Sequence, residues 1–425
     1  MGKYKYSKYN ITVKTTNNFV YLLNSFSGSF CKLEKTIYKT LCKNNDIDED
    51  IKYYDALIEQ GIIVPVDLDE TGRVLFEEQT KLLKIDKDIS YFIIAPTIKC
   101  NMNCYYCFEK RILIENEFSQ EVQNDIIRYI KNNIFNKELE IHWFGGEPLL
   151  KYNDIISFSG HLAREITGNG VVLSCSMTTN GLLLTKEKCE SLCDFGFKEA
   201  QITLDGTIDN YSRIKGVDRK CFEKVLQNIN DCSELIKIKI RLNITRDNVD
   251  DIKKLLKELI PNLKYRTNIS FDVAEVKGVY ESAKKENLFN TKFLDVKKDI
   301  YSLISKLTNK DFYYGYVYTK NKCTSCGMIS ANNIVIGPRG EFYKCDHHIG
   351  DQNFVVGNVK DGLYFNDAFY NYCSIKHPQK CLKCKFLPLC YGGCRNDYLI
   401  NKKTIVNCLE VKKELLYFLK SKYLL

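Results

Sequence analysis

The sequence predicts an α/β fold built around a partial, TIM-like (β/α)6 barrel. Between residues 88 and 310, short apolar runs alternate six times with stretches of helical periodicity. Six β/α units predict a parallel sheet with helices on its outer face, and right-handed crossovers curl such a sheet toward a barrel. Eight units close a barrel, so six leave it open. We expect three domains, covering residues 1–85, 86–310 and 311–425.

The repeating units also predict where a ligand binds. The strand candidates are residues 89–97, 138–144, 171–178, 199–205, 238–244 and 268–275. The helical stretches lie near residues 118–133, 152–166, 185–195, 220–232, 248–260 and 290–308. Ligands of open parallel sheets bind at the carboxyl ends of the strands. The motifs described below follow these strand ends, so we expect them to meet at one edge of the sheet.

The first 85 residues form a module that precedes the barrel. Short β-rich runs begin at Tyr9 and Phe19, helical spacing covers residues 33–42 and 51–60, and a short strand follows Gly61. This strand–strand–helix–helix–strand order predicts a winged-helix-like module. The alternative is a simple packing cap on the barrel.

Composition excludes several classes of protein. The chain has 425 residues, of which 44% are hydrophobic, so it has enough apolar side chains for a sizeable core. Its formal net charge is +9, but 62 basic and 53 acidic residues are interleaved, and no basic stripe predicts nucleic-acid binding. No apolar run approaches the roughly 20 residues of a membrane span. The polar start of the chain does not resemble a signal peptide. We therefore expect a cytoplasmic protein with no nucleic-acid or membrane partner.

Cysteine usage points to metal clusters. There are 19 cysteines, an odd number, in a chain long enough to fold without disulfide bonds. Without a signal peptide, a secreted disulfide scaffold is a poor explanation. Iron–sulfur or other metal clusters in a reducing cytoplasm explain the thiols better.

Three cysteines directly follow the first barrel strand. Cys100, Cys104 and Cys107 lie within eight residues, at spacings of four and then three. A tetrahedral zinc site or a fully ligated four-iron cluster needs four protein ligands. Three thiolates would leave one iron open for a small chelating cofactor. An incomplete zinc site and buried thiols are the alternatives.

This spacing resembles the signature of the radical S-adenosylmethionine (SAM) enzymes. The aromatic pair Tyr105–Tyr106, just before Cys107, fits the same signature. The resemblance implies that Cys100, Cys104 and Cys107 hold a [4Fe–4S] cluster whose fourth iron is chelated by SAM. It also implies that an electron from the cluster cleaves a carbon–sulfur bond of SAM and gives a 5′-deoxyadenosyl radical, with Tyr106 beside the cofactor.

A Gly-Gly-Glu-Pro run follows the second strand. Glycines let the backbone approach a ligand closely, and a carboxylate can accept bonds from an ammonium group. The run resembles the family motif that holds the amino group of the methionine part of SAM, which assigns this role to Gly145, Gly146, Glu147 and Pro148. The alternative is a tight turn into a helix with Pro148 at the first helical position.

Small polar residues follow the third and fourth strands. Thr179 and Asn180 belong to a Thr-Thr-Asn-Gly run, and Thr203 and Asp205 to a Thr-Leu-Asp-Gly run. Both runs resemble segments of related enzymes that contact the ribose or the carboxylate of the cofactor. Capping of the next helix is the alternative for each.

A basic residue lies within the fifth strand. Arg241, two residues before Asn243, is placed to reach the cofactor carboxylate, because an open barrel tolerates such a charge where a sealed core would not. Arg213, in the connection after the fourth strand, is a weaker candidate for the same role.

The last hundred residues carry a second field of cysteines. Eight of them occur at the spacing Cys323-x2-Cys326, Gly340-x4-Cys345, Cys381-x2-Cys384-x5-Cys390-x3-Cys394 and Cys408. Eight is the number that two four-cysteine sites require, and spacing alone does not separate zinc from iron–sulfur.

The pattern resembles the SPASM domain, which carries two auxiliary [4Fe–4S] clusters. The resemblance implies one cluster on Cys323, Cys326, Cys345 and Cys394, and another on Cys381, Cys384, Cys390 and Cys408. Cys323 lies closer to Cys326 than in sulfatase-maturing relatives, so a missing first ligand and an open iron stay an alternative. We expect the remaining eight cysteines to be small buried apolar residues, namely Cys31, Cys42, Cys175, Cys189, Cys193, Cys221, Cys232 and Cys373.

Asp346 directly follows Cys345. In the sulfatase-maturing relatives an acid at this position acts as the base toward substrate, and a carboxylate near a cluster could take a proton after radical chemistry acidifies its neighbour. A solvated turn residue is the alternative.

The expected function follows from these parts. SPASM proteins mostly act on peptides, and the N-terminal module resembles the leader-recognition modules of peptide-modifying radical enzymes. We expect a maturase of a ribosomally made precursor peptide that installs a crosslink, most plausibly a cysteine thioether. It would use three [4Fe–4S] clusters, SAM and an external flavodoxin- or ferredoxin-type electron donor. Sulfatase maturation, carbon–carbon crosslinking, epimerisation and a zinc-bearing peptide adaptor are the alternatives.

Overall fold

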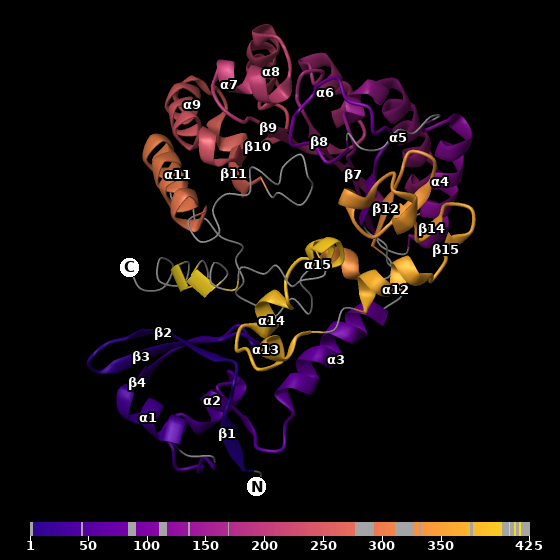
Figure 1. Cartoon of the computed structure of the whole chain (residues 1–425). Coiled ribbons are helices and arrows are strands. Elements are labelled where there is room, and N and C mark those ends of the chain that lie inside the picture. The colour runs from indigo at the N-terminus through magenta and orange to yellow at the C-terminus, as the bar shows by residue number, and fades with distance from the viewer. Residues whose placement is uncertain are drawn as a thin grey trace. The chain divides into compact units, whose positions relative to one another are not determined.

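The computed structural model of the chain divides into two compact units. It describes residues 3–43, 46–83, 91–109, 117–134, 137–168, 170–276, 293–310, 326–330, 333–374, 377–401, 408, 412–413 and 416–417. The barrel unit comprises residues 85–312 and 331–373, and the terminal unit comprises residues 1–84, 313–330 and 374–425 (Figure 1). The predicted third domain is thus shared between the two units, because residues 331–373 cluster with the barrel.

Six parallel strands form the centre of the barrel unit. They pair in the order of the sequence, each with the next. They are β6 (Tyr91–Ile94), β7 (Glu138–Trp143), β8 (Val172–Thr179), β9 (Phe197–Thr203), β10 (Lys237–Ile244) and β11 (Ile269–Glu275). The predicted six-stranded parallel sheet is confirmed, and each predicted strand overlaps an observed one.

The sheet continues past β6 with strands that the sequence did not predict. Strand β12 (Ile334–Ile336) pairs parallel with β6, and β13 (Glu341–Tyr343), β14 (Gly357–Asn358) and β15 (Gly362–Leu363) follow it antiparallel. The result is a ten-stranded sheet. Two of these strands have three residues and two have two, which is too short for a period-two pattern to be recognised.

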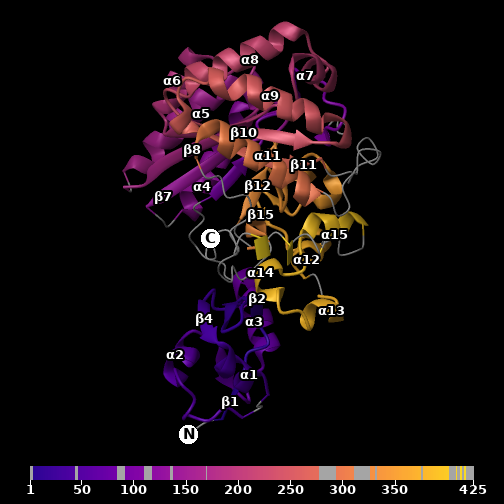
Figure 2. The ribbon, with the colours of Figure 1, turned by 90° about the vertical axis from the view of Figure 1, so that its left-hand side faces the viewer.

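Helices cover the outer side of the curved sheet (Figures 1 and 2). They are α4 (Gln120–Asn133), α5 (Tyr152–Thr167), α6 (Lys186–Cys193), α7 (Ile208–Lys215), α8 (Arg219–Cys232), α9 (Val249–Asn262) and α11 (Phe293–Thr308). Side-chain caps start several of them, as where Asp218 accepts from the amide of Lys220 at 2.8 Å. Helix α7, of eight residues, was not predicted.

Alternation along the strands separates an apolar outer face from a polar inner face. In β10, Ile238, Ile240, Leu242 and Ile244 are buried. The residues between them, Lys239, Arg241 and Asn243, are half-buried. Because neighbouring side chains on a strand point to opposite faces, the isoleucines and leucine pack under the helices and the polar residues line the inner face. A polar lumen of this kind can receive a charged ligand.

The N-terminal part of the terminal unit is a small α/β module. A three-stranded antiparallel sheet has the order β2 (Asn10–Thr15), β3 (Phe19–Asn24), β4 (Phe30–Glu34). Strand β1 (Tyr4–Tyr6) pairs with β5 (Ile63–Pro65). The helices are α1 (Lys35–Lys43), α2 (Tyr54–Glu59) and α3 (Glu70–Leu83). The helix expected from residue 33 starts two residues later, because Leu33 belongs to β4 and pairs with Val20.

The cysteine-bearing C-terminal segment completes the core of this module. Its short helices are α13 (Gln379–Leu382), α14 (Leu387–Cys390) and α15 (Arg395–Asn401), and α12 (Asp367–Cys373) precedes them in the barrel unit. Leu389 packs with Ile11 and Leu23, and Leu387 packs with Tyr9 and Val74. The two segments lie more than 300 residues apart in the chain, so no local pattern predicted their contact.

A buried ionic trio joins the same two segments. Glu78 on α3 contacts His377 at 2.6 Å and Arg395 at 2.5 Å, and all three side chains are almost fully buried. Breaking a buried ion pair by removing one partner is strongly destabilising, since a buried charge is then left uncompensated. The trio therefore ties the module to the cysteine segment.

Among the helices that the structure describes, none is long and apolar enough to cross a membrane.

Candidate active site

The loop that carries Cys100, Cys104 and Cys107 follows β6 and rests on the C-terminal end of α7. The amide of Asn103 donates to the carbonyl of Lys215 at 2.7 Å, and the amide of Tyr105 donates to the carbonyl of Ile214 at 3.3 Å. Helix C-terminal carbonyls lack partners inside their own helix. Two of the carbonyls of α7 are thus used to hold the middle of the cysteine loop.

The three thiols lie close enough to influence one another. Desolvation raises the pKa of Cys100 to about 11, and the negative charges of Glu147, Cys104 and Cys107 add to the shift. Metal ligation requires thiolates, so binding of a cationic cluster would supply the free energy that ionises them.

The glycine pair after β7 lets that turn press against the residues leading into the cysteine loop. A Cβ on Gly145 would lie 2.2 Å from the carbonyl oxygen of Thr97, and one on Gly146 would lie 2.4 Å from those of Ile98 and Lys99. The amide of Gly146 donates to Thr97 at 3.1 Å, and that of Glu147 donates to Lys99 at 2.9 Å. The sequence predicted that these glycines let the backbone approach a ligand closely. In the structure they approach the backbone of residues 97–99 instead.

Glu147 is fully buried and satisfied within the protein. Its carboxylate accepts from the Thr179 hydroxyl at 2.8 Å, from the Asn180 amide at 2.8 Å and from the Leu149 amide at 3.0 Å. Burial raises the pKa of Glu147, and these three donors oppose the rise. Pro148 occupies the first position of a short 3-10 helix, Pro148–Lys151, which matches the alternative that was left open for it. Glu147 and Thr179 therefore join the end of β7 to the end of β8.

Asn180 connects the end of β8 to the cysteine loop. Its side-chain amide donates to Asn101 Oδ1 at 2.7 Å and lies 3.8 Å from the sulfur of Cys100. Its Oδ1 accepts from the Leu182 amide at 3.0 Å. Asn180 thus lies beside a predicted cluster ligand, at the strand end where the sequence placed it.

A buried polar cluster lies behind Tyr106. Its hydroxyl donates to Asp205 Oδ2 at 2.6 Å and accepts from Lys215 Nζ at 3.0 Å and Asn243 Nδ2 at 3.1 Å. Lys215 Nζ also lies 2.7 Å from Asp205 Oδ2. These contacts bring together the ends of β9 and β10, helix α7 and the cysteine loop.

The charges in this cluster are compensated. Burial is the largest influence and would lower the pKa of Lys215, but the charges of Asp205, Tyr106, Cys104 and Tyr211 together outweigh it and hold that pKa well above its usual value. Burial, with Asp205 beside it, raises the pKa of Tyr106 well above its usual value, so the hydroxyl keeps its proton.

Sequence analysis missed Lys215 and named Arg213, two residues earlier, as a weaker candidate beside Arg241. Arg213 is exposed and bonds to Asn210 within its own helix, at 3.0 Å. A signal was present: Lys215 is the last residue of a short helical stretch after the Asp205 strand end. In a helix, residues two apart do not share a face, so only one of these two cations can turn inward.

Arg241 and Thr203 lie opposite each other on neighbouring strands. The guanidinium of Arg241 pairs with Asp272 of β11 at 2.6 Å and donates to Asn243 Oδ1 at 3.1 Å. Arg241 is 35% exposed, so it remains accessible from the lumen. Its contact with a cofactor carboxylate stays a prediction.

Asp346 starts the short 3-10 helix Asp346–His348 and is half-buried. The neighbouring His347 ring stacks on Phe108 at 4.3 Å, which joins this turn to the residue after Cys107. The charge of Asp346 reaches Glu109 and His142. Burial raises the pKa of Glu109 to about 8, with Asp346 and Glu147 adding to the rise, and burial lowers the pKa of His142 to about 4. Glu109, which the sequence did not suggest, belongs to this acidic group.

The thiols of one predicted auxiliary set, in the terminal unit, lie within electrostatic reach of one another. Burial raises the pKa of Cys390 to about 11, and Cys384, Cys381 and Cys408 add to the rise. Burial and the charges of Cys408 and Cys384 likewise raise the pKa of Cys381. Their ligation of a common cluster stays a prediction.

The other predicted set is spread over both units. Cys345 is buried in the barrel unit, whereas Cys326 and Cys394 belong to the terminal unit. Cys323 lies outside the described residues. The grouping of these four stays a prediction. Of the eight cysteines expected to be buried without a role, four are buried, namely Cys175, Cys189, Cys232 and Cys373. Cys31, Cys193 and Cys221 are half-buried, and the prediction is wrong for Cys42, which is exposed because it lies on the solvent side of α1.

Among the described residues, no three Cys, His, Asp or Glu side chains converge closely enough to hold one metal ion. Zinc would require thiolates about 2.3 Å from a common centre. Buried oxygens near the cysteine loop also suit a cofactor that carries hydroxyl and ammonium groups: in the described part of the chain, Asp205 Oδ1 and Glu109 Oε1 have no hydrogen-bond partner.

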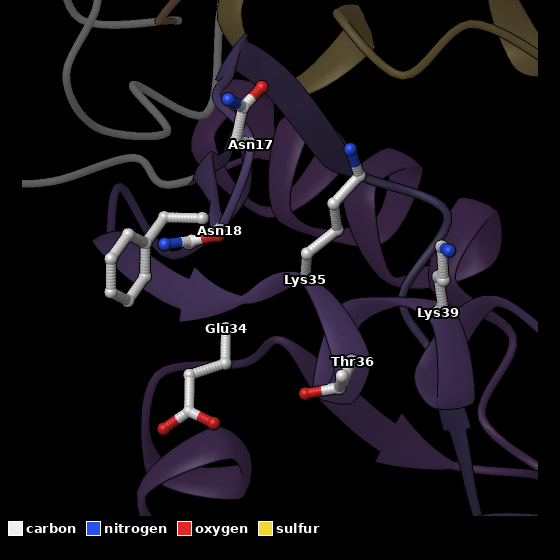
Figure 3. Close-up of a pocket in the computed structure, with 7 residues that line it drawn as sticks. Asn17, Asn18, Glu34, Lys35, Thr36 and Lys39 are labelled. Carbon is white, nitrogen blue, oxygen red and sulfur yellow. The ribbon is translucent and has the colours of Figure 1, made fainter.

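Two surface pockets lie away from the thiols. One, of about 520 Å³, borders the segment before Cys100 and is lined by Thr97, Lys99, Glu117, Ser119, Leu150 and Lys151. Another, of about 480 Å³, lies in the N-terminal module beside the start of α1 (Figure 3). It is lined by Asn17, Asn18, Phe19, Glu34, Lys35, Thr36 and Lys39.

Comparison with known proteins agrees with this site. Residues 94–259, which contain the cysteine loop and five of the six parallel strand ends, match the Radical SAM superfamily. The radical SAM cyclopropyl synthase TigE of Paramaledivibacter caminithermalis is 26% identical, over 91% of this chain and 89% of TigE. A cysteine-type anaerobic sulfatase-maturating enzyme of Clostridium perfringens is 25% identical, over 72% of this chain and 89% of that enzyme.

A solved structure shows the same fold. Streptococcus suis SuiB, bound to its precursor peptide SuiA, has a TM-score of 0.57 at 19% identity, and the match covers 94% of this chain and 97% of SuiB. The matched domain, the three-cysteine loop at the mouth of an open parallel barrel and these relatives agree, and residues 94–259 of the chain form a radical SAM domain.

Proposed function

We propose that the enzyme matures a ribosomally synthesised precursor peptide by installing a crosslink, with a cysteine thioether as the first candidate for the bond. The observation that carries this proposal is the share of this chain that each relative matches. TigE and SuiB cover 91% and 94% of this chain, including its N-terminal module, whereas the sulfatase-maturating enzyme covers 72%. SuiB was solved with a precursor peptide bound. A module that resembles leader-recognition domains, and that shares a core with the cysteine segment, suits a peptide substrate.

The residues around the cysteine loop would hold and orient the cofactors. Cys100, Cys104 and Cys107 would ligate a [4Fe–4S] cluster. When bound, the cluster and SAM supply one-electron cleavage of a carbon–sulfur bond and a species that abstracts hydrogen from carbon. Glu147 and Asn180 fix the two strand ends beside the loop. The polar inner face, with Arg241 half exposed, would receive the charged part of SAM.

Asp346 would act on the substrate. Loss of a hydrogen atom acidifies neighbouring bonds, and a carboxylate within reach can take the proton. Asp346 lies in the barrel unit, within electrostatic reach of β7 through His142. Its other neighbour, Glu109, is kept mostly protonated at neutral pH by a pKa of about 8, so Asp346 is the better proton acceptor of the two.

The C-terminal cysteines would hold two auxiliary clusters. Cys381, Cys384, Cys390 and Cys408 lie within electrostatic reach of one another, which supports one of them. Cys323, Cys326, Cys345 and Cys394 would hold the other. Such clusters can accept the electron that crosslinking releases, or bind a substrate thiolate. An external flavodoxin- or ferredoxin-type donor would supply the first electron.

Carbon–carbon bond formation is the second candidate, and one observation favours it. TigE, which matches almost the full chain, is a cyclopropyl synthase. Formylglycine formation is less well supported, because the sulfatase-maturating relative leaves about a quarter of this chain unmatched.

The test is anaerobic turnover of a short peptide encoded beside the gene. The reconstituted enzyme, SAM and a reductant are incubated with the peptide, and the product is analysed by tandem mass spectrometry before and after alkylation of free thiols. A thioether makes the peptide two hydrogens lighter and removes one alkylatable cysteine. A peptide two hydrogens lighter that keeps its thiols indicates a carbon–carbon bond. Unchanged peptide, alongside conversion of a sulfatase peptide to an aldehyde, would overturn the proposal.

A further inference from the structure

Lys215 is a buried cation directly behind the cysteine loop, and no motif draws attention to it. Its side chain is 4% exposed, and the side chain of its partner Asp205 is 1% exposed. Burial of an ammonium group is costly unless it is paired and hydrogen-bonded. Lys215 meets both conditions, because Nζ lies 2.7 Å from Asp205 Oδ2 and 3.0 Å from the Tyr106 hydroxyl.

The main chain of Lys215 also contacts the cysteine loop. The Lys215 carbonyl accepts from the Asn103 amide at 2.7 Å, and a Cβ at the next residue, Gly216, would lie 3.1 Å from the Cβ of Asn103. Gly216 ends α7 with φ +63, in the left-handed region that favours glycine. Lys215 therefore contacts the loop through both its backbone and its side chain.

The two contacts flank two of the three predicted cluster ligands. Asn103 precedes Cys104, and Tyr106 precedes Cys107. A third connection reaches the strand ends, since Asn243 of β10 also donates to the Tyr106 hydroxyl, at 3.1 Å. Any change in the position of Nζ would therefore move Tyr106 relative to the neighbouring cysteines.

We propose that Lys215 is a positioning residue that fixes the cysteine loop, through Tyr106 and Asn103, in the orientation that binds SAM. This role rests on the proposed ligation of a cluster by Cys100, Cys104 and Cys107. Lys215 contacts the loop at the Tyr106 hydroxyl and the Asn103 amide. It acts through the aromatic side chain and the amide that it holds.

The role requires a long cationic side chain at this position. Removing the charge leaves Asp205 buried without its ion-pair partner, and only the Tyr106 hydroxyl and main-chain contacts remain to hold the loop. Outer residues that orient metal ligands typically change affinity by roughly 10- to 100-fold when they are replaced. We expect a loss of SAM affinity in that range for Lys215→Met, with partial recovery in Lys215→Arg.

The experiment compares Lys215→Met, Lys215→Arg and the matched control Lys220→Met, in which an exposed lysine at the start of α8 is replaced. Each full-length variant is reconstituted anaerobically with iron and sulfide. The readouts are iron per chain, the SAM dissociation constant by equilibrium dialysis, and the change in the electron paramagnetic resonance spectrum of the reduced cluster when SAM is added. The spectral change reports coordination of SAM to the cluster, which a purely structural role of Lys215 would not alter.

The expected result is a weakened SAM affinity and a reduced SAM-dependent spectral change in Lys215→Met, a smaller effect in Lys215→Arg, and wild-type values in Lys220→Met. Wild-type values in Lys215→Met would overturn the inference. If Lys215→Met does not fold, Tyr106→Phe decides, because it removes the hydroxyl and leaves the Lys215–Asp205 pair. It removes all three hydrogen bonds of the hydroxyl and should weaken SAM binding by at least roughly 5-fold, the effect expected for a single lost hydrogen bond. Unchanged affinity would overturn the inference. A wild-type enzyme without any SAM-dependent spectral change would instead refute the proposed function.

Discussion

Replacement of Gly146 by alanine tests how the turn after β7 holds the cysteine loop. A Cβ at this position would lie 2.4 Å from the carbonyl oxygens of both Ile98 and Lys99, and both are main-chain atoms that cannot rotate away. Lys99 is followed directly by Cys100. The matched control is Gly168→Ala, because Gly168 has helical φ −61 and no atom of the described residues lies within 4 Å of the place that its methyl group would take.

The magnitude follows from the geometry. Ordinary van der Waals contact begins near 3.4 Å, so the two carbonyls must move by roughly 1 Å to admit the methyl group. Overpacking of this kind costs about 1–3 kcal/mol. At about 2–4 °C per kcal/mol for a unit of this size, the melting temperature should fall by roughly 2–12 °C. The control should be neutral, or more stable by up to about 1 kcal/mol.

The assay is thermal unfolding by circular dichroism before reconstitution, followed by iron analysis after it. Because the displaced carbonyls precede Cys100, we expect Gly146→Ala to lose about four of roughly twelve irons, the content of one [4Fe–4S] cluster. Equal melting temperatures and equal iron content in Gly146→Ala and Gly168→Ala would refute the role given to the glycine pair.

Three further predictions test other parts of the account. Glu78→Gln should destabilise the terminal unit by about 3–5 kcal/mol in chemical unfolding, because it leaves Arg395 and His377 without their carboxylate. The control Glu34→Gln, in an exposed pair with Lys52, should cost about 1 kcal/mol or less. Equal effects of the two changes would contradict the buried trio. Cys384→Ala should remove about four irons per chain, while Cys42→Ala, at an exposed thiol, should remove none. Equal iron content in the two variants would contradict the auxiliary set of Cys381, Cys384, Cys390 and Cys408. The pKa of Glu109 is raised to about 8, so its neutral form stabilises the fold fully below pH 4.5, and this contribution is lost as the pH rises to about 8. When the pH rises from 5 to 8, the cluster-free Glu109→Gln variant should lose less unfolding free energy than the wild type, by at most about 4 kcal/mol. Identical pH profiles would contradict the burial of this carboxyl.

The repeating core of the fold could be predicted from local patterns. Strands such as β8 and β10 alternate buried and half-buried residues, and Ser119, Thr185 and Asp218 cap the helices that follow loops. These signals lie within a few residues of one another, which is the range that periodicity can detect. The boundary error at Leu33 has the same origin, because one residue can fit the end of a strand or the start of a helix equally well.

The site could be predicted only in part, since its motifs act through distant partners. Glu147 was chosen for an ammonium ligand, but its three donors come from its own turn and from the end of β8. The role proposed for Lys215 depends on its hydrogen bond to Tyr106, which lies 109 residues earlier in the chain. Contacts between residues so far apart produce no periodic pattern in the sequence.

The terminal unit shows the same limit. Leu387 and Leu389 complete the core of a module that begins at the other end of the chain, and neither residue stands out in the sequence. The four thiols Cys381, Cys384, Cys390 and Cys408 were grouped by their resemblance to a known domain, and their proximity in the structure supports that grouping.

The central claim is that three thiolates at the mouth of an open barrel leave one iron for SAM. The most direct measurement is the release of 5′-deoxyadenosine from SAM by the reduced, anaerobically reconstituted enzyme, followed by liquid chromatography. The account predicts release by the wild type, none by a variant with Cys100, Cys104 and Cys107 replaced by alanine, and retention of the auxiliary irons in that variant. Release of 5′-deoxyadenosine by the triple variant, or none by a wild-type enzyme that holds its full complement of iron, would contradict it.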